Sequence, residues 1–155
     1  MQKIFRLSIA FLSFVVVSCT TVQPSDTGIT QPISSKYYAW RLSDSAEYHA
    51  INALIVEADQ LIENNALDEA ADKLERILRI KPRYAPAWSR LSWVTMQSNE
   101  PARSIEMAKR SNSFAQGNQK LLLLNWTFIR AASQMLGDDE AYRQADQKIE
   151  SLRSI

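Results

Sequence analysis

The sequence contains very little cysteine, glycine and histidine, and it has no excess charge of either sign. Its 155 residues include one Cys, three Gly and one His. One Cys cannot form an internal disulfide, and a single His cannot build a conventional His-rich metal site. Eighteen basic and 17 acidic residues give a net charge of +1, so no global basic field attracts nucleic acid. The scarcity of glycine and the apolar fraction of 46% are typical of a packed helical domain.

Motifs that carry out chemistry are also missing. The sequence has neither a Gly-rich phosphate-binding loop nor a nucleophile elbow, and its Lys and Arg residues are interspersed with acids rather than gathered in a stripe. We interpret His49 as structural or solvated. Asp138-Asp139-Glu140 could be read as a metal cluster, but three acids also suit the positive end of a helix. We therefore predict a protein that is not an enzyme and that uses no metal or cofactor.

The first 18 residues have the three parts of a secretory signal. Lys3 and Arg6 form a basic start, an apolar centre covers residues 7–17, and the small residue Ser18 ends the segment. The apolar centre is shorter than the roughly 20 residues that a membrane span needs. An ordinary secretory signal with an incidental cysteine is the alternative to the interpretation that follows.

The signal ends in Val16-Val17-Ser18-Cys19, which resembles the lipobox of bacterial lipoproteins. The resemblance implies that residues 1–18 are removed and that the Cys19 thiol and the new amine are acylated, so that no thiol remains for a Cys–His dyad. Several acyl chains would anchor the protein in a membrane. In the enterobacterial sorting rule an Asp after the cysteine retains a lipoprotein in the inner membrane. Thr20 at that position therefore implies the outer membrane, with the domain in the periplasm.

Residues 19–43 are predicted to be the lipidated cysteine and a flexible linker. Ser, Thr and Gln surround the breaker residues Pro24, Gly28 and Pro32. A flexible segment of this length has a typical span of about 27 Å. Three aromatic residues stand out near its end: Tyr37, Tyr38 and Trp40. We expect these aromatic residues to pack on the first helix, and a partner-binding aromatic patch is the alternative.

Residues 44–155 are predicted to form a helical domain that repeats at an offset of 34 residues. At this offset Ala58 matches Ser92 and Ala70 matches Ser104. Small residues at these positions would lie where paired helices cross, because larger side chains would force the helices apart. After Phe114 the offset grows to about 38, so we expect two units in register and a divergent third.

Capping and breaking residues give the expected bounds of six helices. The first runs from Asp44, with Glu47 completing a capping box, to Asn64-Asn65. Asn65 is predicted to cap the second helix, with Asp68 reaching back, and Pro82 to end it. The other four helices are expected at about 86–97, 100–113, 118–136 and 138–153.

The segment LDEAADKLERILRIKPRYAPAW, residues 67–88, resembles the tetratricopeptide repeat. The small residues at 58 and 92, and those at 70 and 104, match the consensus small positions, and Pro82 matches the proline that ends the second helix of a unit. The resemblance covers about residues 46–153. It implies an all-α fold, a short superhelix of about three antiparallel helical hairpins.

In tetratricopeptide proteins the first helix of each hairpin lines an inner groove that binds a polypeptide. Trp93 and Met96 beside Arg90 would resemble a binding hot spot in such a groove. The alternative is that Trp93 is buried between units. The predicted groove residues are Asn52, Ile55, Asp59, Ile62, Ser89, Arg90, Trp93, Met96, Gln97, Thr127, Arg130 and Gln134.

Residues 81–115, with Lys109-Arg110-Ser111-Asn112, and the later Asn125-Trp126 resemble compact tetratricopeptide lipoproteins of Gram-negative bacteria. These include LpoP-type activators of class A penicillin-binding proteins. The resemblance implies an adaptor that binds such a periplasmic peptidoglycan synthase and raises its rate in cell-wall biogenesis. The alternative is a scaffold or pilotin-like assembly factor for an outer-membrane, pilus or secretion machine, which the short linker suits better. Neither alternative involves nucleic acid or a small-molecule substrate.

Overall fold

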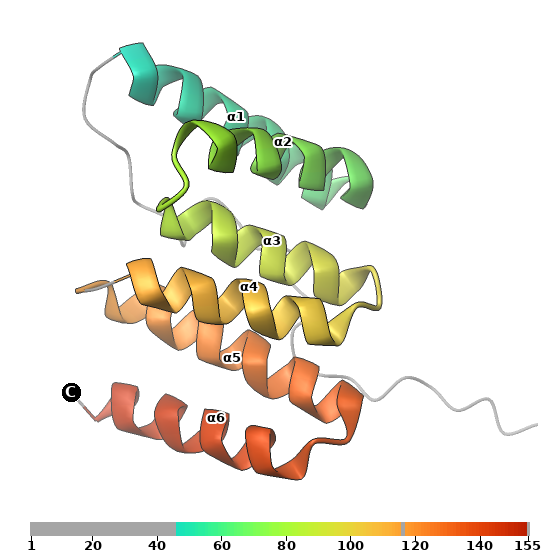
Figure 1. Cartoon of the computed structure of the whole chain (residues 1–155), viewed down its shortest axis with the longest axis vertical. Helices are drawn as coiled ribbons and strands as arrows, with labels where there is room; N and C mark the ends of the chain where they lie inside the picture. Colours follow the sequence, from blue (N-terminus) through green and yellow to red (C-terminus); the bar gives the residue numbers. More distant parts are fainter. Residues whose placement is uncertain (1–45, 116, 155) are drawn as a thin grey trace, which may run out of the picture.

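The computed structural model describes residues 46–115 and 117–154, which form a stack of helices. The helices are α1 (Ala46–Glu63), α2 (Leu67–Ile80), α3 (Ala85–Gln97), α4 (Pro101–Phe114), α5 (Gln119–Leu136) and α6 (Asp139–Arg153). Short turns join them into three hairpins, α1–α2, α3–α4 and α5–α6, which follow one another along the longest axis (Figure 1). The described residues contain no strand, so the prediction of an all-α domain is confirmed for them.

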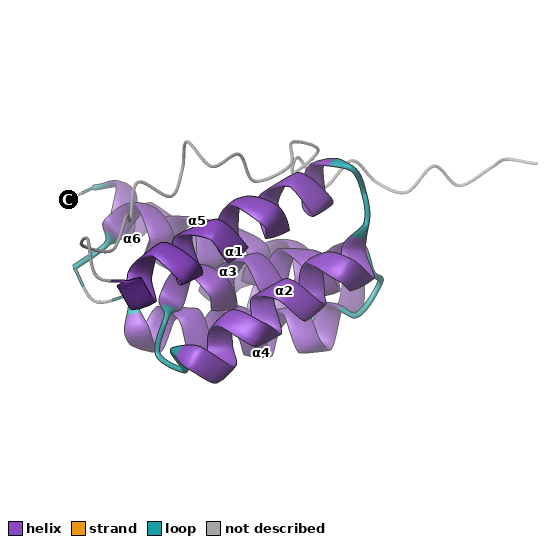
Figure 2. Ribbon diagram, turned by 90° about the horizontal axis from the view of Figure 1, so that it is seen from above, coloured by secondary structure: helices purple, strands orange, loops and turns teal. Residues whose placement is uncertain are grey.

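Consecutive helices along the chain pack against each other, and α3 also contacts α5. Seen from above, α2 and α4 lie on one side of α1, α3 and α5 (Figure 2). Along the longest axis, the middle hairpin α3–α4 lies between α1–α2 and α5–α6 (Figure 1). This arrangement encloses α3, in which 11 of the 13 residues are buried.

Several sequence predictions concern residues outside the described part of the chain. These are the signal at 1–18, the lipidation of Cys19, and the linker at 19–43 with its aromatic residues Tyr37, Tyr38 and Trp40. The capping box of Asp44 and Glu47 also lies outside, since side chains are described only from His49 onward. These predictions remain predictions.

The turn inside each hairpin uses a residue in the left-handed conformation. The three residues are Asn65 (φ 58°), Asn99 (φ 62°) and Gly137 (φ 68°). Gly adopts this conformation without strain, and Asn adopts it more readily than most residues. Asn65 therefore ends α1, and the prediction that it caps α2 is wrong. The residue at that cap is Ala66, which has no side-chain hydrogen bond to the helix.

A backbone hydrogen bond to the carbonyl five residues earlier closes each of these turns, as in a Schellman motif. The donor and acceptor pairs are Ala66 N–H to Leu61 C=O (2.8 Å), Glu100 N–H to Thr95 C=O (2.9 Å) and Asp138 N–H to Ser133 C=O (3.0 Å). The first two turns are 34 residues apart and the third follows after 38, the same two offsets that relate the units in the sequence. The repeat is therefore present in the backbone as well as in the side chains.

Polar and proline residues set the other helix ends near the predicted positions. The side chains of Asn118 and Asp138 accept hydrogen bonds from the N–H groups of Leu121 (3.0 Å) and Ala141 (2.9 Å). Asp138 and the acids after it thus act at a helix start, as expected. The second helix ends at Ile80, two residues before Pro82, since Pro disfavours the α conformation in the residue that precedes it.

The small residues chosen from the repeat lie at the helix crossings. Ser92 on α3 donates a hydrogen bond to the Ser104 carbonyl on α4 at 2.9 Å, and the two hydroxyl oxygens are 3.1 Å apart. Ala58 on α1 and Ala70 on α2 are fully buried. The expected close approach is confirmed for the second hairpin by this direct contact.

We expect Ala70→Leu to lower the free energy of unfolding by about 1–3 kcal/mol, because the added methyl and methylene groups would overpack the α1–α2 crossing. Ala53→Leu is the matched control, since Ala53 is an exposed residue of the same hairpin. Denaturant titration followed by circular dichroism measures both variants. An unchanged midpoint for Ala70→Leu would contradict the close crossing in this hairpin.

Candidate functional site

The first helices of the hairpins, α1, α3 and α5, carry all twelve predicted groove residues. Six of the twelve are buried, and these are Asp59, Ile62, Ser89, Arg90, Trp93 and Met96. Trp93 is only 6% exposed and belongs to the hydrophobic core, as the alternative interpretation held. The expectation that these six side chains are open to a partner is corrected. The physical reason is that α3 contacts α2, α4 and α5, so a three-hairpin stack covers its faces.

Two of these buried residues form an ion pair that links the first hairpin to the second. Arg90 Nε lies 2.6 Å from Asp59 Oδ1, and Arg90 Nη2 lies 2.9 Å from Asp59 Oδ2. The exposed fractions of the two side chains are 1% and 6%. Arg90 also donates to the Pro86 carbonyl at 3.2 Å. This two-pronged geometry fixes the orientation of α1 relative to α3.

Tyr84, just before α3, is close enough to this ion pair to respond to its charges. Burial raises the pKa of the Tyr84 hydroxyl, while the charge of Arg90 lowers it and that of Asp59 raises it. The net change is upward, so the phenol is neutral at physiological pH. Tyr84 is therefore a neutral polar neighbour of the Arg90–Asp59 pair and adds no third charge to it.

The other six predicted residues keep contact with solvent. Gln97 and Gln134 are exposed, whereas Asn52, Ile55, Thr127 and Arg130 are half-buried. The exposed Gln97 and Gln134 lie on α3 and α5. These six residues are what the predicted groove offers to a partner at its surface.

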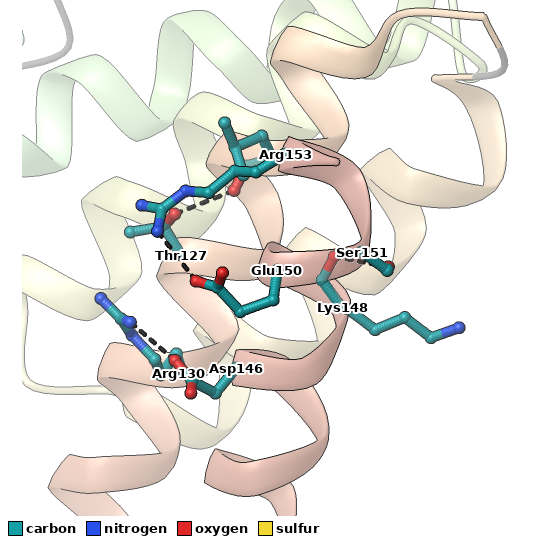
Figure 3. A network of polar contacts seen from close by, with 8 residues as sticks. Thr127, Arg130, Asp146, Lys148, Glu150, Ser151 and Arg153 are labelled. Carbon is teal, nitrogen blue, oxygen red and sulfur yellow. Dashed lines mark hydrogen bonds and ion pairs between the residues drawn. The ribbon is translucent and has the colours of Figure 1, made fainter. Parts of the chain in front are cut away.

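Polar side chains cover the junction of α5 and α6 (Figure 3). Arg130 points toward α6 and its Nη1 lies 2.9 Å from Asp146 Oδ1, and Arg153 Nη1 lies 2.9 Å from Glu150 Oε1. The Thr127 hydroxyl donates to the Leu123 carbonyl of its own helix. The Arg153–Glu150 pair is exposed and the Arg130–Asp146 pair is only part-buried, so neither is expected to add much stability.

A second buried polar group joins the middle hairpin to the third. Asn125 Nδ2 on α5 donates to Ser111 Oγ and to Asn112 Oδ1 on α4, both at 2.8 Å. The Ser111 hydroxyl in turn donates to the Ala85 carbonyl at the start of α3 at 2.9 Å. The structure therefore brings together Ser111-Asn112 and Asn125, two stretches that carry the sequence resemblance to Gram-negative lipoproteins.

The described residues carry polar side chains on a packed stack of helices. Between His49 and Ser154, with residue 116 excepted, no group of three or more His, Cys, Asp or Glu side chains is arranged to hold a metal ion. His49 itself is exposed on α1. The helices of this part are too short or too polar to cross a bilayer. What the site can do chemically is present hydrogen-bonding and charged side chains at fixed positions.

These features define the class of the protein as a helical-hairpin domain whose units are joined by buried polar links. No protein-family model matches the chain, and no curated protein matches it. A solved structure does: the globular C-terminal domain of P. aeruginosa LpoP matches with a TM-score of 0.62 and 31% sequence identity, covering 65% of this chain and 95% of that domain. The chain therefore belongs to the same family as this LpoP domain.

Proposed function

We propose that the protein is an adaptor that activates a class A penicillin-binding protein, as LpoP-type lipoproteins do. The observation that supports this is the 31% identity to the LpoP domain across 95% of that domain, joined to the same fold. In this proposal the protein itself catalyses nothing and needs no cofactor. It binds a periplasmic domain of the synthase and raises its glycan-polymerising or cross-linking rate.

We also propose that the hairpins are tetratricopeptide-like units on a lipid-anchored chain. The 34-residue spacing of two left-handed turns and the serine contact at the α3–α4 crossing support the repeat assignment. The lipobox-like sequence that ends at Cys19 supports the anchor. Thr20 supports the outer membrane, with the domain facing the periplasm.

The activation assay compares the rate of a purified class A penicillin-binding protein with and without this protein. We expect a higher rate of glycan polymerisation or cross-linking in its presence. The double variant Gln97→Arg/Gln134→Arg changes two exposed positions on α3 and α5 without touching the core, and we expect it to lose most of the stimulation. Glu106→Arg, an exposed change on α4, is the matched control. Equal rates with and without the wild-type protein would contradict the proposal.

Photo-cross-linking in the intact cell envelope identifies the partner independently. The photoreactive residue is placed at Gln134, which is exposed, rather than at the buried Trp93. Capture of a peptidoglycan synthase at Gln134 but not at Glu106 would support activation. Capture of a secretin or of a barrel-assembly component would support the scaffold alternative instead.

Cys19→Ser is expected to abolish lipidation and release the protein from the membrane. Without the thiol no diacylglyceryl group can be attached, and the hydrophobic contribution of its acyl chains, about 0.8 kcal/mol per buried CH₂, is lost. Detergent partitioning and a gel shift measure the result. Ser18→Ala is the control, since a small residue is kept before the cysteine. Continued partitioning of Cys19→Ser into detergent would contradict the lipid anchor.

A further inference from the structure

A pocket of about 380 Å³ lies between α2, α3 and α4, and none of the twelve predicted groove residues lines it. Its apolar wall is formed by Leu78 and Leu91, which are buried, and by Met107 and Trp88, which are half-buried. A recess of this kind can take an apolar side chain out of water.

Three arginines stand around this apolar wall. The charge of Arg103 is paired with two carboxylates. Its Nη2 lies 3.6 Å from Oε1 of Glu75, which also lines the pocket, and its Nη1 lies 3.3 Å from Oε2 of Glu100. Arg79 and Arg110 differ, because no carboxylate in the described ranges 49–115 and 117–154 forms an ion pair with either. The pocket therefore combines an apolar wall with two positive charges that no carboxylate of these described ranges neutralises.

Trp88 holds one of these charges in place. Its indole Nε1 donates to the Pro82 carbonyl at 2.7 Å, which fixes the ring. The Arg110 guanidinium lies over this ring, 4.8 Å from its centroid. When a guanidinium stacks with its planar face on an aromatic ring, the N–H groups around its edge can still donate hydrogen bonds to the two oxygens of a carboxylate.

We propose that this pocket binds an acidic peptide segment. An Asp or Glu carboxylate of the peptide is held by Arg79 and Arg110, and an adjacent Leu or Phe side chain of the peptide packs against Leu78 and Met107. Charge complementarity with Arg79 and Arg110 favours an acidic peptide, and a recess with an apolar wall takes a single apolar side chain rather than a flat layer of headgroups. The site goes beyond the proposed function, since it does not depend on which synthase the protein binds.

The test measures binding of the full protein to N-acetylated, C-amidated hexapeptides by fluorescence polarisation at low and physiological salt. The peptides combine Asp or Glu with Leu or Phe, and each has a matched peptide with Asn or Gln in place of the acid. We expect the acidic peptides to bind about tenfold more tightly than their amide counterparts, and less tightly as salt rises. Equal binding of the two sets would overturn the proposal.

Variants of the protein locate the binding. Arg79→Gln and Arg110→Gln are each expected to weaken the acidic peptides by about tenfold. Arg83→Gln is the matched control, because Arg83 lies over Phe114 at 5.4 Å in a similar stack outside the pocket. A loss with Arg83→Gln as large as with Arg110→Gln would overturn the assignment, as would binding to phosphatidylglycerol vesicles without binding to the peptides. The peptide-binding assay does not measure stimulation of a synthase. A negative result in this assay would therefore overturn the pocket proposal and leave the proposed function untouched.

Discussion

Asp59→Ala is expected to lower the free energy of unfolding by about 3–5 kcal/mol, because breaking a buried ion pair on one side leaves a charge in a poorly hydrated site. Arg90 is only 1% exposed and would lose the carboxylate to which it donates through Nε and Nη2. The link between α1 and α3 would be lost with it. Guanidinium chloride titration of the wild type and the variant gives the difference.

Two further variants separate the effect of burial from the effect of pairing. Glu57→Ala removes the ion pair between Lys73 Nζ and Glu57 Oε2, whose length of 2.6 Å equals that between Arg90 Nε and Asp59 Oδ1. Because the Lys73–Glu57 pair lies at the surface, we expect a much smaller change in the free energy of unfolding. The double variant Asp59→Leu/Arg90→Met replaces the buried pair by apolar side chains and should recover most of the stability. A loss for Asp59→Ala no larger than that for Glu57→Ala would contradict the argument.

Phe128→Ala is expected to lower the free energy of unfolding by about 3–5 kcal/mol through the cavity left on α5. Phe128 is fully buried, and α5 packs against α3 and α4 as well as against α6. The loss should therefore appear in one transition of the whole stack. Far-ultraviolet circular dichroism and tryptophan fluorescence, followed along the same titration, measure the loss and its cooperativity.

Leu136→Ala on the same helix is the control for this variant. Leu136 is 48% exposed, so we expect a small change. Two separate transitions in Phe128→Ala would show that the divergent third hairpin unfolds by itself. That result would contradict a single cooperative unit, which the contacts from α5 to both helices of the middle hairpin lead us to expect.

The sequence could predict the features that depend on local chemistry. Pro82 sets the end of α2 because it disfavours the α conformation in the residue that precedes it. The small residues at 92 and 104 could be placed at a crossing because only their size matters there. Asn65 lies at a helix boundary, as the sequence predicts, but the sequence does not reveal the positive φ angle that makes it the end of α1 rather than the cap of α2.

Features that depend on neighbouring hairpins could not be predicted in the same way. A helical period shows which residues share a face, but not how many other helices cover that face, so Trp93 and Met96 could not be distinguished from surface residues. The pairing of Asp59 with Arg90 joins positions 31 residues apart. One signal was available, since Arg90 is the only charged residue of α3. Arg79 and Arg110 lie on different helices, so the sequence does not show that they line one pocket.

The left-handed turns have a consequence for the rate at which the chain refolds. Each turn is closed by a bond between residues five positions apart, and each hairpin joins helices that are adjacent in the chain. The loop-closure entropy of every hairpin is therefore small, and the next hairpin adds to an existing one over a short distance along the chain. A stack with such low contact order should refold quickly, without waiting for distant segments to meet.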